Sequence, residues 1–259
     1  MCGRYASFRE AQDLADAFDV EDVTDAAAEV AANYNVAPTD PIRIVLDRAP
    51  KPTTADVEGG HGHLVEQGTA EAAVRREMHL ARWGLVPAWA KDLSVGARMF
   101  NARSESLAES RAFRKPLESK RCVVVADGYY EWHKTPVPGT KKVDRTPFYI
   151  HPTDGSPVAF AGLYAWWPDR SKPADDPDRW VLSATIVTAD ARDGLEQIHD
   201  REPAMLTPAG VATWLDPTVT DPGEALAVLA APAPAVSWHE VGAQVGSVRN
   251  NSPELIRPI

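Results

Sequence analysis

Short runs of apolar and β-branched residues fill most of the chain after Met78, and they limit the possible folds more than any other feature of the sequence. Runs of about four to eight such residues, bounded by turn-forming residues, predict β-strands. We expect strands at Ile42–Leu46, His79–Leu85, Cys122–Ala126, Phe148–His151, Val158–Leu163, Val181–Thr188 and Val236–Val241. Many short strands with few helices between them predict an α+β fold, in which helices flank a curved, barrel-like, mainly antiparallel sheet.

Fewer segments carry helical signals. Ser7 and Glu10 form a capping-box pattern, and apolar residues recur at helical spacing as far as Phe18, so residues 8–18 are predicted to be an amphipathic helix. The acidic, Ala-rich stretch to Ala32 is compatible with an extension of this helical region, and residues 33–38 are predicted to be a loop. Further helices are expected at Ser104–Glu109, at Arg192–Ile198, from Pro208 with Thr207 as its cap, and at Glu224–Leu229.

The length of 259 residues is compatible with one large domain or two small ones, and we favour a single domain over residues 1–259. Residues 47–75 differ from their surroundings, because they mix Pro, Gly, Ala and acidic residues without periodicity. This composition predicts a flexible surface insertion with little packed structure.

Neither a run of about 18 apolar residues nor a secretory signal is present. Only Cys2 and Cys122 carry thiols, which are too few for a disulfide framework or a four-cysteine zinc site. Cys122 is expected to be a buried strand residue. The pair His61 and His63 lacks further metal ligands nearby. We therefore expect a soluble, cytoplasmic protein that needs no metal and no cofactor.

The formal charge of −10 argues against a protein that coats nucleic acid non-specifically, because such binding needs clustered Lys and Arg. The charge is unevenly distributed, however. Residues 9–29 hold eight acidic groups and one basic group, whereas residues 98–121 hold seven basic and three acidic groups. The second segment can therefore form a local phosphate-binding surface.

A cysteine follows the initiator methionine, and its side chain is small enough for Met1 to be removed. The mature chain would then begin with a 1,2-aminothiol, in which amine and thiol belong to one residue. An aldehyde forms a Schiff base with the amine, and the adjacent thiol can close a five-membered thiazolidine ring. From its position alone, Cys2 is more often an incidental residue.

Six short motifs occur in an order along the chain that is specific, and the three at 100–105, 126–132 and 198–203 lie at predicted strand or helix edges. They are Cys-Gly-Arg-Tyr at residues 2–5, Tyr-Asn-Val-Ala-Pro at 34–38, Arg-Trp-Gly-Leu-Val-Pro at 82–87, Phe-Asn-Ala-Arg-Ser-Glu at 100–105, Ala-Asp-Gly-Tyr-Tyr-Glu-Trp at 126–132 and Ile-His-Asp-Arg-Glu-Pro at 198–203. Together they resemble the SRAP family, the SOS-response-associated peptidases. The resemblance extends from Cys2 to the closing segment at 248–251.

The resemblance implies a DNA–protein crosslink to the aldehyde of a ring-opened abasic site, in which Asn101, Glu131 and His199 assist Cys2. A partly buried Glu131 can act as the acid that expels water from the carbinolamine, and His199 can shuttle protons. Asn101 can orient the amine and the sugar through its amide. Without the family pattern, Glu131 is more often a salt-bridged carboxylate, Asn101 a turn residue, and His199 a histidine bonded to Asp200.

Several residues are expected to contact DNA. Four arginines occupy positions that resemble the family's phosphate contacts, and forked guanidinium groups suit phosphates. These are Arg4, Arg103, Arg111 and Arg201. Trp83 and Trp132 can stack on bases, although core packing is the default for a tryptophan. Pro38 and the loop before it can press against the DNA or support the site.

The sequence thus predicts a monomeric sensor of abasic sites in single-stranded DNA, which forms a covalent thiazolidine through Cys2 and shields the lesion during replication. Removal of Met1 would be autoproteolytic, and a lyase side activity is possible because a Schiff base acidifies the adjacent carbon. Two alternatives stay open: a thiol autopeptidase or peptidase that uses Cys2, and a non-covalent single-stranded DNA-binding module.

Overall fold

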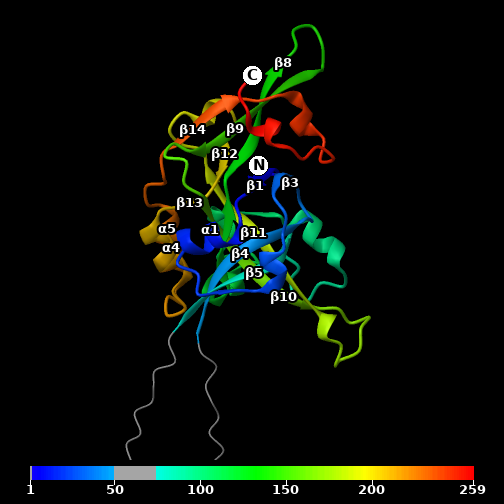
Figure 1. Ribbon diagram of the computed structural model, residues 1–259, viewed down its shortest axis with the longest axis vertical. Coiled ribbons are helices and arrows are strands. Elements are labelled where there is room, and N and C mark those ends of the chain that lie inside the picture. Colours follow the sequence, from blue (N-terminus) through cyan, green and yellow to red (C-terminus); the bar gives the residue numbers. More distant parts are fainter. Residues whose placement is uncertain (1, 50–73) are drawn as a thin grey trace, which may run out of the picture.

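The computed structural model describes residues 2–49 and 74–259, and five of its strands form a closed barrel (Figure 1). Antiparallel pairing joins neighbouring strands in the order β5, β4, β7, β10, β11. Parallel pairing of Arg82 with Ser183 and of Trp83 with Ala184 then joins β5 to β11 and closes the circuit. The five strands are β4 (Pro41–Arg48), β5 (Arg75–Trp83), β7 (Arg121–Ala126), β10 (Val158–Pro168) and β11 (Trp180–Asp190).

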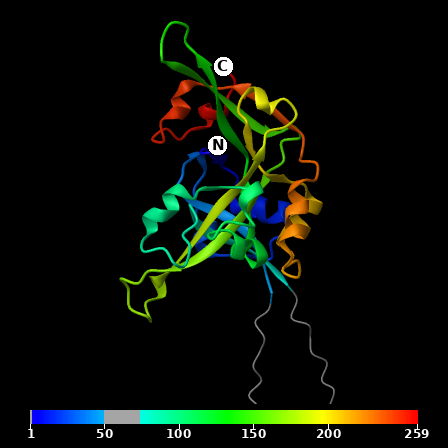
Figure 2. The same cartoon turned by 180° about the vertical axis from the view of Figure 1, so that it is seen from behind.

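Four short strands extend this barrel sheet: β2 (Asp22–Val23), β6 (Asn101–Arg103), β12 (Arg201–Pro203) and β13 (Met205–Leu206). A second sheet, wholly antiparallel, has the order β14-β9-β8-β1-β3. Its strands are β1 (Tyr5–Ser7), β3 (Asn33–Val36), β8 (Gly128–Pro136), β9 (Val143–Pro152) and β14 (Val236–Glu240). The hairpin of β8 and β9 projects from the end of the molecule farthest from the barrel (Figures 1 and 2). The prediction of a barrel-like, mainly antiparallel α+β fold is confirmed.

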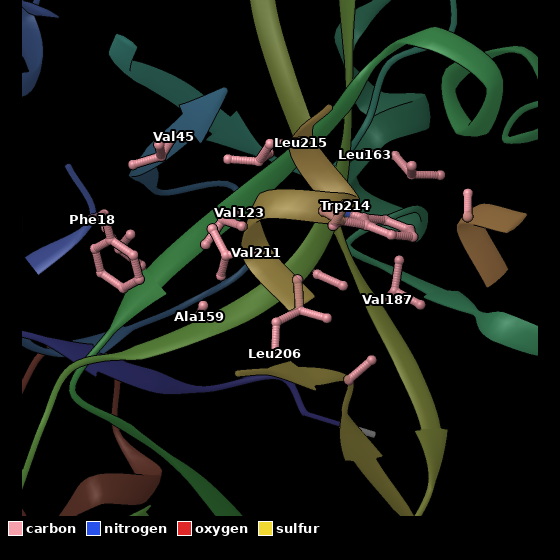
Figure 3. Packing of buried hydrophobic residues seen from close by; sticks show 14 of the residues in the cluster. Phe18, Val45, Val123, Ala159, Leu163, Val187, Leu206, Val211, Trp214 and Leu215 are labelled. Carbon is pink, nitrogen blue, oxygen red and sulfur yellow. The ribbon is translucent and has the colours of Figure 1, made fainter. Parts of the chain in front are cut away.

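Successive side chains of a barrel strand point to opposite faces of the sheet, so neighbouring residues belong to two different hydrophobic clusters. Ile42, Ile44 and Leu46 of β4 belong to the cluster that also holds Cys2 and Trp83. The intervening Val45 belongs to the cluster that packs against the helices. Figure 3 shows this helix-facing cluster, in which Val211 and Trp214 of α4 lie over Val123 and Ala159 of the sheet.

The helices are short, and each α-helix contributes buried residues to the helix-facing cluster. The α-helices are α1 (Ala11–Ala17), α2 (Asp25–Ala28), α3 (Arg114–Ser119), α4 (Pro208–Leu215) and α5 (Pro222–Leu229). The 3₁₀ helices are η1 (Leu93–Arg98), η2 (Ser104–Ser106), η3 (Pro177–Arg179), η4 (Leu195–Gln197), η5 (Ala243–Gly246) and η6 (Pro253–Ile256). In the described part of the chain, no helix is long and apolar enough to cross a membrane.

The predicted strands all occur, and β5, β9 and β10 extend beyond their predicted bounds. The Thr207 cap of α4 is confirmed, since its side chain accepts a hydrogen bond from the Gly210 amide.

The capping box was wrong. Ser7 ends β1, and α1 begins only after Glu10, which makes no side-chain cap. The predicted loop at 33–38 was also wrong, because pairing with β1 draws residues 33–36 into β3.

The helix predicted at Glu224–Leu229 is confirmed, because α5 covers this whole segment. The remaining helical predictions hold only in part. The segments at 104–109 and 192–198 contain only the three-residue η2 and η4, and the stretch to Ala32 is divided between β2 and α2.

Most of the predicted insertion at 47–75 lies outside the described residues. Its ends belong to the barrel, because Asp47 pairs with Arg76 and Arg48 with Arg75. The flexibility of the intervening segment stays a prediction.

A buried arginine holds the helix layer to the barrel. The Arg121 guanidinium donates to Leu117 O and Glu118 O in α3, to Trp214 O in α4, and to Asp216 O and Val219 O beyond it. The last carbonyls of a helix lack partners within the helix and carry partial negative charge. Arg121 therefore satisfies the ends of two helices at once.

Replacing Arg121 by Met is expected to lower the free energy of unfolding by about 3 to 5 kcal/mol. Several buried carbonyl groups would lose their donor, at about 1 to 3 kcal/mol each. Urea unfolding followed by circular dichroism measures the change. Arg114→Met, at an exposed position of α3, is the matched control. Equal stability of the two variants would contradict this account of Arg121.

Candidate active site

Cys2 is fully buried immediately before β1. β1 lies between two partners, because Tyr5 pairs with Tyr129 of β8 on one side and with Val36 of β3 on the other. The Cys2 side chain packs in the same cluster as Tyr5 and Tyr129. Cys2 is thus enclosed in the core rather than exposed to solvent, and Figure 1 shows β1, which follows it, beside β3.

Asn101 contacts the backbone of Cys2 directly. Its Nδ2 donates a hydrogen bond of 2.7 Å to the Cys2 carbonyl. Pairing with Ile186 of β11 fixes Asn101 at the barrel edge. The other amide atom, Oδ1, is buried and accepts no hydrogen bond within the described part of the chain. The site therefore holds a buried acceptor that can receive an N–H or O–H from a substrate or from the chain's own amine.

Glu131 of β8 supplies a buried carboxylate, with only 6% of its surface exposed. Burial raises the pKa of the Cys2 thiol well above its usual range, and the negative charge of Glu131 raises it further. A thiolate is disfavoured in such surroundings because it would be desolvated and repelled. The Cys2 thiol is consequently protonated at neutral pH.

His199 lies in the connection between η4 and β12, at the border of the cluster around Cys2, to which its neighbour Ile198 belongs. The Arg201 amide donates to Nδ1 at 3.0 Å. Asp200 Oδ1 lies 2.8 Å from the same Nδ1 and is largely exposed. The contact with Asp200 that the sequence suggested is present.

Arg4 is held by Asn35, which belongs to the segment before Pro38 that was expected to press against the DNA or support the site. Arg4 Nη1 donates to Asn35 Oδ1 at 2.8 Å and to Val245 O at 3.0 Å, and its guanidinium lies 5.9 Å from the ring centroid of Trp132. The buried Asn35 amide also donates to Val245 O, Ser247 O and Asn250 O. Asn35 therefore connects the C-terminal segment to the start of the chain. Its place in the quoted Tyr-Asn-Val-Ala-Pro motif was the available signal.

The other predicted arginines differ in accessibility. Arg103 is exposed, and Arg111 is exposed with its guanidinium 5.0 Å from the ring of Trp89. Arg201, in contrast, is bound by Glu105, Asp190 and the Thr188 carbonyl, and 10% of its side chain is exposed. Arg201 fixes β12 and η2 to the end of β11, and it presents little surface to a phosphate.

Trp83 does not match its predicted role in base stacking. It is fully buried and donates its indole hydrogen to Phe100 O, so the core role applies. Pro38 is half-buried, and the following Thr39 has a φ of +83°, which is strained for a β-branched residue. Arg82 Nη1 donates to Thr39 O, and the Thr39 amide donates to Trp83 O. The Pro38 turn is thus held in place by the barrel.

Asp127 and Gly128, which precede Glu131 in the same motif, determine where β8 begins. The Asp127 carboxylate accepts from the Phe8 and Arg9 amides and from the Arg9 side chain, which ties the end of β1 to β8. A Cβ at Gly128 would lie 2.6 Å from Ile150 O. Only glycine lets β9 approach this closely. Both residues lie in the quoted motif, but their roles depend on contacts with distant strands.

Among residues 2–49 and 74–259, no group of three or more His, Cys, Asp and Glu side chains is arranged to hold a metal ion.

The model of the SOS response associated peptidase (SRAP) family matches residues 1–248 of this sequence. The chain belongs to the SRAP family. The residues around Cys2 described above are therefore the candidate active site of an SRAP protein, and the resemblance inferred from the six motifs is confirmed.

Named relatives of this SRAP protein are similar in sequence over nearly the whole chain. Abasic site processing protein YoqW from Bacillus subtilis is 36% identical over 258 residues, which is 99% of each chain. Abasic site processing protein YedK from Escherichia coli is 31% identical over 263 residues, which is 100% of each chain. A crystal structure of a protein from Bacteroides thetaiotaomicron has a TM-score of 0.72 with 21% identity and covers 100% of each chain, which shows a shared fold.

Replacing Glu131 by Gln in this SRAP protein should lower the pKa of the Cys2 thiol, because the substitution removes a negative charge that disfavours the thiolate. The pH dependence of alkylation by iodoacetamide, followed on the Cys2 peptide by mass spectrometry, measures the shift. Glu109→Gln, at an exposed position, serves as control. A thiol pKa that stays constant or rises in the Glu131 variant would show that Glu131 does not act on Cys2.

Asn35→Ala is expected to reduce the free energy of unfolding by about 2 to 3 kcal/mol and to expose residues 242–259 to proteolysis, because buried carbonyls of that segment lose their donor. Urea unfolding and limited proteolysis with mass analysis test this. Asn250→Ala keeps the backbone carbonyl that Asn35 binds, and it should cost less than about 1 kcal/mol. If both variants release the segment equally, Asn35 is not its anchor.

Proposed function

We propose that this SRAP protein captures abasic sites in single-stranded DNA by forming a covalent thiazolidine through Cys2 after removal of Met1. The observation that carries the proposal is the placement of a second-position cysteine in a buried site, with its carbonyl held by Asn101 and the charge of Glu131 acting on its thiol. The names of the relatives YoqW and YedK, both abasic site processing proteins, support the choice of lesion.

The amine reacts first in this mechanism. An abasic deoxyribose in its ring-opened form presents an aldehyde, and the neutral α-amine of Cys2 adds to it to give a carbinolamine. Loss of water then gives a Schiff base, and this loss needs a proton donor. The Glu131 carboxylate takes a proton from the carbinolamine nitrogen and gives it to the departing hydroxyl, so that a neutral imine and water form and the carboxylate is restored. His199 exchanges protons with the sugar hydroxyl as the ring opens. The buried Asn101 Oδ1 accepts a hydrogen from the amine and orients it.

The thiol reacts second, because it is protonated and poorly nucleophilic in the buried site. The Cys2 sulfur attacks the imine carbon, a carbon–sulfur bond forms, and the thiol proton passes through the Glu131 carboxylate to the imine nitrogen. The product is a five-membered thiazolidine. Because both nucleophiles belong to one residue, the ring closes without loss of translational freedom. The overall reaction joins protein and DNA with loss of one water.

Several partly or fully exposed groups suit the flanking DNA. Arg4 and Trp132 lie together beside the site, and Arg103 and Arg111 are exposed for contacts with phosphates. The proposal leaves out Arg201 and Trp83, whose side chains are engaged within the fold. Conversion of the aldehyde into a thiazolidine would shield the lesion while replication continues.

A thiol peptidase is the second candidate, and the surroundings of Cys2 argue against it. Thiol peptidases need a thiolate, which positive neighbours stabilise. Here burial and a carboxylate raise the pKa of the thiol instead. We retain autoproteolysis only for the removal of Met1. A lyase reaction competes at the Schiff base, and ring closure by the thiol suppresses it.

Intact-mass spectrometry after incubation with a single-stranded oligonucleotide that carries one abasic site tests the proposal. Protein without Met1 should gain the mass of the oligonucleotide less one water. The adduct should be absent with undamaged DNA and with Cys2→Ala. Glu131→Gln should form it at least about 100-fold more slowly, since general acid–base catalysis contributes about 10²- to 10⁴-fold.

An added residue before Cys2 that cannot be cleaved separates the two candidates. It blocks the α-amine, so thiazolidine formation should stop, whereas cleavage of an external peptide by the thiol would continue. Absence of an adduct from protein that has already lost Met1 would falsify covalent capture. Equal, salt-reversible retention of intact and abasic strands would then favour the non-covalent binding module.

A further inference from the structure

The hairpin of β8 and β9 carries a concentration of positive charge. Residues 133–146, named here the basic arm, project beyond the rest of the second sheet (Figures 1 and 2). Within the arm, Lys134, Lys141, Lys142 and Arg145 are exposed, and Asp144 is the only acidic residue. The arm is therefore positive in a chain whose formal charge is −10.

Two of these cations lie directly opposite each other. Lys134 of β8 pairs with Arg145 of β9, and Asp144 pairs with Thr135 on the other face of the ribbon. Like charges at directly opposed positions destabilise an antiparallel pair. In the part of the chain that the structure describes, none of the ion pairs uses Lys134 or Arg145. Folding leaves this pair without a balancing acid, and a bound anion would remove the repulsion.

The basic arm is continuous with the candidate active site. Glu131, Trp132 and Lys134 belong to the same strand, so Lys134 lies about 10 Å along the chain from Glu131 and the tip lies about 20 Å away, at about 3.3 Å per residue. The arm contains no Phe, Tyr or Trp. It therefore lacks the stacking surfaces that hold unpaired bases. Its exposed cations suit phosphates, which carry no sequence information.

We infer that the basic arm binds the phosphate backbone of the DNA that flanks the lesion on one side. This inference rests on the proposed function, because it takes a strand anchored at Cys2 as the ligand. The arm supplies affinity without base specificity. It also gives a reason for the unbalanced Lys134–Arg145 pair, which the fold itself does not need.

The test compares two variants with the same change in net charge. Arg145→Glu reverses one member of the cross-strand pair, and Arg170→Glu makes the same reversal at an exposed position between β10 and β11. Glu opposite Lys134 forms an attractive pair, so the melting temperature of Arg145→Glu should equal or exceed that of the wild type. Initial crosslinking rates are measured against the concentration of an abasic single-stranded oligonucleotide at several salt concentrations.

Arg145→Glu should raise the half-saturating oligonucleotide concentration by at least about fivefold and reduce the slope of log affinity against log salt by about 0.7 or more, which is the contribution of one single-strand phosphate contact. The maximal crosslinking rate should stay unchanged, and Arg170→Glu should match the wild type. Two further oligonucleotides carry the lesion near the 5′ end or near the 3′ end, so that flanking DNA is long on one side only. Arg145→Glu should weaken crosslinking of one of these two oligonucleotides and leave the other unchanged.

Identical concentration dependence of the two variants, in a wild type that crosslinks, would overturn the inference and leave the proposed function intact. If Arg145→Glu weakened crosslinking equally with the lesion near either end, the inference would also be overturned, because the effect would then come from net charge rather than from a contact on one side of the lesion. If the wild type forms no crosslink, the proposed function fails, but DNA binding by the basic arm can still be tested by fluorescence anisotropy with an undamaged strand. Weaker binding by Arg145→Glu, and not by Arg170→Glu, supports the inference. Equal binding by the two variants refutes it.

Discussion

The pairing of β5 with β11 is the contact on which the rest of the molecule depends. Only Arg82–Ser183 and Trp83–Ala184 join the two strands, yet this short parallel contact turns an open sheet into a barrel. It also leaves the last residues of β11 free to pair with β6 and β12. Asn101 and His199 thereby come to the same end of the barrel. Because the paired segments are about 100 residues apart, their closure costs chain entropy that the buried core must offset.

Burial at the meeting of the two sheets determines the chemistry available to Cys2. A thiol in solvent would be partly ionised near pH 8 and open to oxidation. Enclosure beside Tyr5, Tyr129 and Glu131 keeps it protonated. The carbonyl of Cys2, rather than its thiol, receives the fixed hydrogen bond from Asn101. Asn101 thus restrains Cys2 through its backbone carbonyl and does not bind the Cys2 sulfur.

The apolar strands of the barrel could be predicted from the sequence. Both faces of β4, β7, β10 and β11 are buried over much of their length, so these strands consist largely of β-branched and apolar residues. β1, β3 and β8 could not, since polar and aromatic residues make up much of them and their pairing joins distant segments. The motifs named Asn101 and Glu131, whose amide and charge act on Cys2 in the structure, and their catalytic roles stay predictions. The burial of Trp83 and the role of Asn35 depend on long-range contacts that local pattern does not encode.

The position of β1 has a mechanical consequence. β1 is flanked on both sides, with the Tyr130 amide bound to Arg4 O and the Asp127 amide bound to Ala6 O. A pulling force applied at Cys2 in the direction of β1 would act parallel to this strand. The hydrogen bonds to β3 and β8 are then loaded in shear and must fail together, whereas a strand peeled from a sheet edge loses its bonds one by one. Under the proposed covalent capture, a DNA strand joined to Cys2 and pulled along β1 would load these hydrogen bonds together.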